Sequence, residues 1–233
     1  MYKYKDKIRY SHVDKKGKVP PYEILNFFQN CSTEQSEVIG KGVKYMLDHG
    51  KGWVIVGYKL VFERAVKYED DIVIGTAPTG FKGFFARRKY AIMDESENFI
   101  VKADSLWTLI DMESRSPIRI TEEEYEGYPM EDGFEGIKAE RKLVFDAEAT
   151  KMPSITVPKS FIDNNGHMNN ANYLRATYEY MEETKDIKEI QIAFLKEAVE
   201  GQEMIPYKYD LEDATGIEFR DTDGDVLCKV LVK

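Results

Sequence analysis

Hydrophobic and polar residues alternate over much of the chain, and this pattern predicts a protein built mainly from β-strands. Runs rich in Val, Ile, Phe and Tyr are bounded by turn sequences such as DESEN and DTDGD, as in antiparallel hairpins. The pattern predicts strands at residues 53–62, 71–78, 84–94, 99–111, 190–196, 205–213, 216–221 and 225–233. The opening residues, MYKYKDK, show the same alternation and are also expected to form a strand.

Two segments have helical spacing instead. Pro21 suits the first turn of a helix, where its missing N–H costs nothing. The apolar face of this helix is expected to contain Ile24, Leu25, Phe28 and Cys31. A second helix is expected shortly after residue 168. Its apolar stripe is expected to contain Ala171, Leu174, Tyr178 and Met181.

An acidic stretch, TEEEYEGYPMEDGFEG (121–136), separates two groups of strands. Thr121 and Glu124 have the spacing of a capping box, which predicts one short helical turn, and the remainder is expected to be a linker. We therefore divide the chain into an N-terminal half (1–120), an acidic linker (121–140) and a C-terminal half (141–233).

The order of strand, helix and several strands occurs twice. Residues 14–19 match residues 163–168 at an offset of 149 (163 − 14). Arg64 falls opposite Glu197 at an offset of 133 (197 − 64), which predicts a shorter helix-to-strand connection in the second half. An internal repeat of this kind is typical of a duplicated α+β unit.

The two copies of the repeat differ in their candidate catalytic residues. Lys18 stands where the second copy has His167, and Arg64 stands opposite Glu197. The first copy therefore lacks the residue types that the second copy contains.

The loop FIDNNGHMNNANYL (161–174) carries the densest polar chemistry of the chain. Asp163 and Glu197 supply carboxylates, His167 can move protons near neutral pH, and Asn165 can orient a neighbour without titrating. Backbone N–H groups at the start of the following helix would suit a developing oxyanion. A loop rich in Asn and Asp is also an ordinary helix cap, so these residues alone leave both interpretations open.

Composition narrows the possible partners. The chain has 233 residues and is 42% hydrophobic, which is enough for one large domain or two small ones. Its net charge of −9 argues against binding to nucleic acid or to anionic membranes.

No apolar run reaches membrane-spanning length and no signal-peptide pattern opens the sequence, so we expect a cytoplasmic protein. Cys31 and Cys228 match no metal or redox spacing.

Three blocks of the sequence resemble the acyl-ACP thioesterase family. They are the Asp-x-Asn-x-His loop followed by Met-Asn-Asn, the stretch ADSLWTLIDMESRSPIRI (103–120), and the stretch FKGFFARRKYAIMD (81–94). The resemblance implies an α+β fold of the tandem hotdog type, in which two long helices are each wrapped by a continuous antiparallel sheet. It also implies hydrolysis of acyl-acyl carrier protein (acyl-ACP) to a free fatty acid, at the end of fatty acid synthesis, with no cofactor and no metal.

The family's catalytic residues fall on Asp163, Asn165, His167 and Glu197. Many relatives have a cysteine directly after this glutamate, whereas this chain has Ala198, so a Cys–His mechanism is not available. Either a carboxylate activates water, or Asp163 attacks the carbonyl to give an anhydride.

An acidic carrier protein needs a basic docking surface on an acidic enzyme. The densest run of cations is in the N-terminal half, where the acyl-chain slot is also expected. It consists of Lys82, Arg87, Arg88 and Lys89.

Other functions fit the same fold: an acyl-CoA thioesterase, a hydratase with the same Asp/His chemistry, or a non-enzymatic sensor of acyl thioesters. A sensor that regulates transcription would need a DNA-reading module, and no basic helix-turn-helix precedes the first strand. Because the tandem chain supplies both hotdog units, we expect a monomer or a homodimer.

Overall fold

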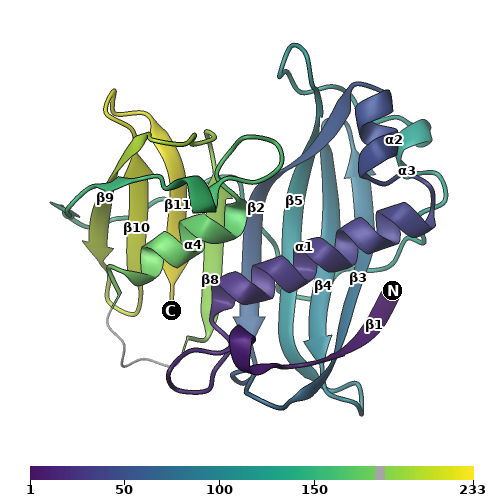
Figure 1. The fold of residues 1–233 in the computed structure, drawn as a ribbon, viewed down its shortest axis with the longest axis horizontal. Helices are drawn as coiled ribbons and strands as arrows, with labels where there is room; N and C mark the ends of the chain where they lie inside the picture. The colour runs from purple at the N-terminus through teal and green to yellow at the C-terminus, as the bar shows by residue number, and fades with distance from the viewer. Residues whose placement is uncertain (182–186) are drawn as a thin grey trace.

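One large antiparallel sheet curves around two helices that lie on the same face (Figure 1). The computed structural model describes residues 1–181 and 187–233. The strands are β1 (Tyr2–Lys7), β2 (Lys51–Phe62), β3 (Asp71–Lys82), β4 (Phe85–Met93), β5 (Phe99–Asp111), β6 (Ala149–Lys151), β7 (Ile155–Thr156), β8 (Glu189–Phe194), β9 (Glu203–Asp210), β10 (Thr215–Arg220) and β11 (Val226–Val232). The helices are α1 (Pro21–Val38), α2 (Val43–Asp48), α3 (Glu122–Tyr125) and α4 (Asn170–Tyr178), with 3-10 turns η1 (Tyr10–His12) and η2 (Lys159–Phe161).

The strand order has a pseudo-twofold axis at its centre. It runs β1-β3-β4-β5-β2-β8-β11-β10-β9-β6, and β7 also pairs with β9. The central strands β2 and β8 pair antiparallel, with Lys59 opposite Gln191 and Gly57 opposite Ala193. The same sequence of neighbours follows on each side of this pair. The tandem hotdog with a sheet continuous across both halves is therefore confirmed.

Helix α1 fills the concave side of the N-terminal half. Pro21 occupies its first turn, as the sequence predicts. The predicted apolar face is buried in the main core and consists of Ile24, Leu25, Phe28 and Cys31. Burying an aliphatic or aromatic side chain of this size contributes roughly 1.5–3 kcal/mol, so this face anchors the helix to the sheet.

The second helix is shorter than expected. α4 has nine residues and α1 has eighteen. Ala171 and Leu174 are buried as predicted, but Met181 follows the end of the helix. The connection to β8, expected to be short, includes residues 182–186, which lie outside the described residues. None of the described helices is long and apolar enough to cross a membrane.

The eight long strands predicted from alternation are all present, within four residues at each end. Alternation did not predict the short elements β6, β7 and α2, which have too few residues to show a period. The capping box of Thr121 and Glu124 is present at α3, with the Thr121 N–H donating to Glu124 Oε2 over 2.8 Å.

The linker crosses the centre of the sheet against a glycine. A Cβ on Gly57 would lie 2.8 Å from the carbonyl oxygen of Glu140 and 3.2 Å from that of Ile192. The pairing of β2 with β5 shifts by one residue between Ile55 and Gly57. The absent side chain therefore allows the linker backbone to pass close to β2, where β2 pairs with β8.

Candidate functional site

The loop before α4 is a tight turn built around one carboxylate. Asp163 Oδ1 accepts the backbone N–H of Asn165 over 2.8 Å and that of His167 over 3.4 Å. The backbone closes the same turn, because the Asp163 N–H donates to the His167 carbonyl over 2.8 Å. Gly166 has a φ of +80°, a region that favours glycine. The spacing of Asp163 and Gly166 therefore follows from the shape of the turn.

Neighbouring elements hold this loop on both sides. Asn169 caps α4 by accepting the N–H of Ala171 over 2.9 Å. The Met168 N–H donates to the carbonyl of Ala198 over 2.8 Å, which ties the loop to the segment after β8. From α4, the hydroxyl of Tyr173 accepts the N–H of Ala198 over 2.9 Å. These bonds fix the loop relative to Glu197.

The structure brings together the predicted imidazole of His167 and the predicted carboxylate of Glu197, in the segment after β8. His167 Nε2 lies 3.3 Å from Glu197 Oε2. The same oxygen accepts a hydrogen bond from the guanidinium of Arg115, in the turn after β5. Arg115 was not among the predicted site residues. It is one of two arginines near the end of the block 103–120, with Arg119, and that position was the only signal for it.

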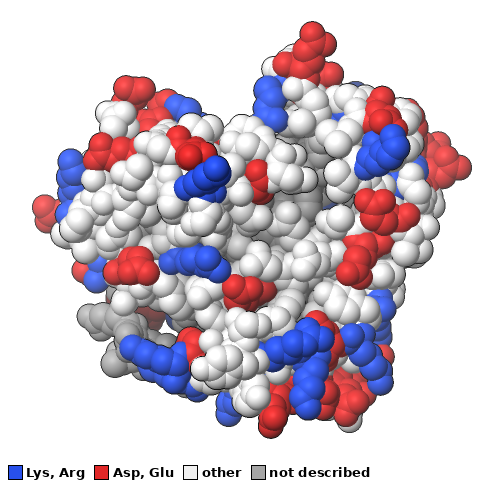
Figure 2. Space-filling view, in the orientation of Figure 1, with Lys and Arg blue, Asp and Glu red and all other residues white. Residues whose placement is uncertain are grey.

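One long cavity connects this cluster with the N-terminal half. Its volume is about 1080 Å³, and Asp163, Asn165, His167 and Glu197 all line it. It continues along the polar face of α1 at Ser32 and Ser36, and its other walls come from β2, β4 and β5. Figure 2 shows that this face of the molecule is hollowed between the two halves. The cavity is large enough for an acyl chain.

The start of α4 offers fewer free donors than the sequence suggests. The N–H groups of Met168, Asn169, Ala171 and Asn172 all donate to protein acceptors. Asn170 lines the cavity, and its backbone N–H has no acceptor within the described chain. The expected row of oxyanion donors is therefore reduced to this one group.

The four predicted docking cations do not form one exposed surface. Arg88 is only 9% exposed, so its assignment as a docking residue is wrong. Its guanidinium lies on the helix-facing side of β4, bonds to Gln35 and Thr76, and stacks over the ring of Tyr128. Strand alternation explains this, because neighbouring residues point to opposite faces. Lys82 is exposed at the end of β3.

Arg87 and Lys89, on the outer face of β4, hold the acidic linker. Arg87 pairs with Asp104 over 2.6 Å and donates to the carbonyl of Ala139 over 3.1 Å. Lys89 pairs with Glu131 over 3.0 Å. Burial raises the pKa of Asp104, although Arg87 and the Ala139 N–H act in the opposite direction. These cations neutralise a nearby acidic segment of the same chain.

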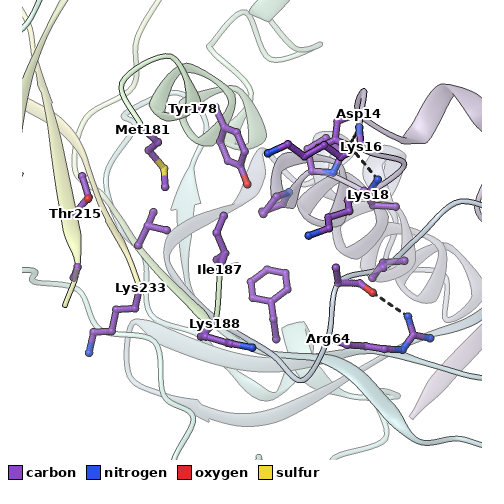
Figure 3. Close-up of a pocket in the computed structure, with 18 of the residues that line it drawn as sticks. Asp14, Lys16, Lys18, Arg64, Tyr178, Met181, Ile187, Lys188, Thr215 and Lys233 are labelled. Carbon is purple, nitrogen blue, oxygen red and sulfur yellow. Dashed lines mark hydrogen bonds between the residues drawn. The ribbon is translucent and has the colours of Figure 1, made fainter. Parts of the chain in front are cut away.

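The first copy of the loop forms the same turn but lacks groups equivalent to the His167 imidazole and the Glu197 carboxylate. Asp14 Oδ1 accepts the N–H of Lys16 over 2.8 Å and that of Lys18 over 3.0 Å, as Asp163 does in the second copy. This turn opens on a cavity of about 870 Å³. In Figure 3, Lys18 and Arg64 lie across this cavity from Tyr178 and Met181. Among the described residues that line this cavity there is no histidine, and the one glutamate is Glu63.

The structure corrects one part of the alignment between the two halves, the pairing of Arg64 with Glu197. The Val19 N–H donates to the Val66 carbonyl, and the Met168 N–H donates to the Ala198 carbonyl. Val66 is therefore equivalent to Ala198, at an offset of 132 (198 − 66), and Ala65 rather than Arg64 is equivalent to Glu197. The conclusion about the carboxylate is unchanged, since the first copy has none at this position.

Neither thiol is placed for chemistry. Cys31 and Cys228 are both fully buried. Burial raises the pKa of the Cys31 thiol to about 12 and raises that of Cys228 well above its usual range. Within residues 1–181 and 187–233, no three His, Cys, Asp or Glu side chains gather closely enough to hold a metal ion.

The tandem hotdog and the contact of His167 with Glu197 in a long cavity are compatible with a hydrolase of acyl thioesters. The acyl-ACP thioesterase N-terminal domain family matches residues 1–128, and the C-terminal domain family matches residues 145–228. The chain therefore belongs to the acyl-ACP thioesterase family. Among curated proteins, none matches it significantly in sequence.

Solved structures support the fold over its whole length. An acyl-ACP thioesterase from Bacteroides thetaiotaomicron has a TM-score of 0.86 at 20% identity, covering 99% of this chain and 96% of that one. A provisionally assigned oleoyl thioesterase from Lactobacillus plantarum has a TM-score of 0.87 at 21% identity, with coverages of 99% and 94%. The 12:0-ACP thioesterase from Umbellularia californica has a TM-score of 0.84 at 15% identity, with coverages of 100% and 97%.

Proposed function

We propose that the chain hydrolyses acyl-ACP to a free fatty acid, with Asp163, His167 and Glu197 as its acid–base groups and Asn165 beside them. The observation that carries the proposal is the contact of 3.3 Å between His167 Nε2 and Glu197 Oε2, two residues that line the long cavity. A carboxylate and an imidazole in contact can take a proton from water and later return it to a leaving group.

The proposed reaction uses water rather than a covalent intermediate. Asp163 Oδ1 already accepts two backbone N–H groups, and this stabilises the carboxylate charge that an attack on the carbonyl would consume. The His167–Glu197 pair takes a proton from water as the water oxygen attacks the thioester carbon. The N–H of Asn170, a residue that lines the cavity, would stabilise the developing oxyanion. When the C–S bond breaks, the pair returns the proton to the departing thiolate.

The cavity suggests how the substrate divides between the halves. The thioester would lie beside the cluster in the C-terminal half, and the acyl chain would extend between α1 and the strands of the N-terminal half. The carrier protein would remain outside. Of the cations predicted for docking, Lys82 is the one with an exposed side chain, and we keep it as a contact for the acidic carrier.

Release of free thiol from acyl-ACP and from acyl-CoA, compared over a series of chain lengths, tests the proposal. We expect a higher kcat/KM for acyl-ACP and strong loss of activity in His167→Ala. Lys18→Ala is a matched control, because Lys18 occupies the equivalent position in the first copy. Equal or faster hydrolysis of acyl-CoA would favour an acyl-CoA thioesterase, and no hydrolysis of either substrate would overturn the proposal.

A further inference from the structure

A single carboxylate oxygen joins three residues from both halves of the molecule. Glu197 Oε2 accepts a hydrogen bond from the Arg115 guanidinium and lies 3.3 Å from His167 Nε2. Arg115 belongs to the N-terminal half, whereas the other two residues belong to the C-terminal half. The predicted acid–base pair is therefore in contact with a cation from the other repeat.

The turn that carries Arg115 is built to hold it in place. Asp111 Oδ1 accepts both the N–H and the hydroxyl of Ser114, each over 2.7 Å. The Asp111 N–H donates to the carbonyl of Ser116 over 3.0 Å. Arg115 itself has a φ of +55°, which costs a residue other than glycine on the order of 1 kcal/mol. A strained residue held by its neighbours and aimed at a candidate active site suggests a functional role.

Stability does not explain this contact. The Arg115 side chain is 38% exposed and that of Glu197 is 42% exposed. Pairs of this exposure contribute between zero and about 1 kcal/mol, which barely offsets the backbone cost of the turn. The role of this contact must therefore be sought in the effect of the Arg115 side chain on the groups beside it.

The hydrogen between Glu197 and His167 can belong to either partner. A carboxylate anion only accepts, so an ionised Glu197 requires the hydrogen to be on Nε2 of the imidazole. A neutral imidazole with its hydrogen on Nε2 has Nδ1 as its acceptor. The Arg115 guanidinium donates to this same carboxylate oxygen and so fixes its position beside Nε2. The hydrogen bond from Arg115 is thus connected to the choice of imidazole tautomer.

We propose that Arg115 is a positioning residue for the proposed hydrolysis: it holds the Glu197 carboxylate in place as an acceptor, which fixes His167 with its hydrogen on Nε2. Arg115 acts through Glu197 and not on the substrate. This inference rests on the proposed function, because it assigns a role within the same acid–base pair. The active site is then complete only when the N-terminal half supplies its cation.

The kinetic test compares Arg115→Met, Arg115→Gly and Arg115→Lys with the matched control Arg119→Met, an exposed arginine in the same region. Arg115→Gly removes the side chain and the backbone strain together, so it keeps the turn. We expect kcat to fall at least about tenfold in the Met and Gly variants on both acyl-ACP and a small acyl thioester, with little change in KM. Lysine should recover part of the loss, and Arg119→Met should behave as wild type.

A double-mutant cycle separates this role from others. If Arg115 acts through Glu197, adding Arg115→Met to Glu197→Gln should cause no further loss. Equal losses in both backgrounds would overturn the proposal and indicate a direct role. A rise only in KM for acyl-ACP would overturn it as well and indicate carrier docking. A wild-type protein without thioesterase activity would instead refute the proposed function.

A second measurement does not depend on activity. The chain contains three histidines, so the ring nitrogens of His167 can be resolved and assigned by ¹⁵N NMR. We expect the tautomer with hydrogen on Nε2 in the wild type and in Arg119→Met, and a mixed or altered form in Arg115→Met. An unchanged His167 spectrum in Arg115→Met would overturn the proposal even if activity fell.

Discussion

Asp14 and Asp163 close two turns of the same geometry at pseudo-symmetric positions. Each carboxylate accepts two backbone N–H groups through Oδ1, over 2.8 and 3.0 Å in the first turn and over 2.8 and 3.4 Å in the second. Only the second turn carries a histidine beside a glutamate. Asp163 therefore has a structural role that Asp14 shares, in addition to its proposed role in catalysis.

Alanine substitutions at the two positions should separate these roles. Asp14→Ala and Asp163→Ala should each lower the free energy of unfolding by about 1 kcal/mol, because each removes the acceptor of two backbone N–H groups. Only Asp163→Ala should also lower kcat/KM, by about 100-fold or more. Urea denaturation and thioester hydrolysis measure the two effects.

Asparagine provides the control at the same position. Asp163→Asn keeps an oxygen that can accept the two N–H groups, so its unfolding free energy should lie nearer to the wild type than that of Asp163→Ala. Its activity should remain low. Full activity in Asp163→Asn would show that the carboxylate is purely structural.

Local patterns were sufficient to predict much of this fold. The turn at 163–168 depends on the spacing of Asp and Gly within six residues, and the helix face from Ile24 to Cys31 depends on periodicity within two turns. Both are properties of neighbouring residues. For the same reason, the sequence placed His167 in its turn correctly.

Features that depend on how distant segments meet were not accessible in this way. The contact between Arg115 and Glu197 joins residues 82 positions apart, across two repeats. Adjacent cations at Arg87 and Arg88 were interpreted as one cluster, but a strand sends neighbours to opposite faces. The alignment of Arg64 with Glu197 was one residue out, and only the hydrogen bonds between segments correct it.

A protein without thiols should remain active. Cys31→Ala and Cys228→Ala remove side chains that are buried in the core, where the pKa of Cys31 is raised to about 12 and the thiol stays protonated at neutral pH. We expect the double variant to keep a kcat/KM within about threefold of wild type, with a loss of stability of roughly 1–2 kcal/mol from the small cavities. A folded but inactive double variant would contradict this mechanism.

Asp104 should make stability depend on pH, and its pairing with Arg87 should weaken that dependence. Burial already raises the pKa of Asp104, so its ionisation in the folded state lowers stability as pH rises above the unfolded value of about 4. Arg87→Met removes the main opposing charge and should raise this pKa further. The loss of stability in Arg87→Met should therefore be small near pH 4 and should grow toward pH 8, reaching roughly 2–3 kcal/mol.

Denaturation at several pH values in the Asp104→Asn background provides the control. With no carboxylate at this position, Arg87→Met should lose its pH dependence, although it should still weaken the contact with Ala139. A loss of equal size at pH 4 and pH 8 in the single variant would show that Arg87 acts by packing and not through the charge of Asp104.

Charge reversal at Lys82 and at Arg88 should give different results, although the two residues are close in sequence. Arg88 is only 9% exposed and bonds to Gln35 and Thr76, so Arg88→Glu should destabilise the fold by several kcal/mol, on the order of 3–5.

Lys82 is exposed, and Lys82→Glu should fold normally. If Lys82 contacts the acidic carrier, Lys82→Glu should raise KM for acyl-ACP a few-fold, and the effect should fade at high salt. Lys5→Glu makes the same charge change on exposed β1, next to the opposite end of β3, and should leave KM unchanged. A similar rise in KM for both variants would mean that net charge governs carrier binding and that Lys82 has no specific role.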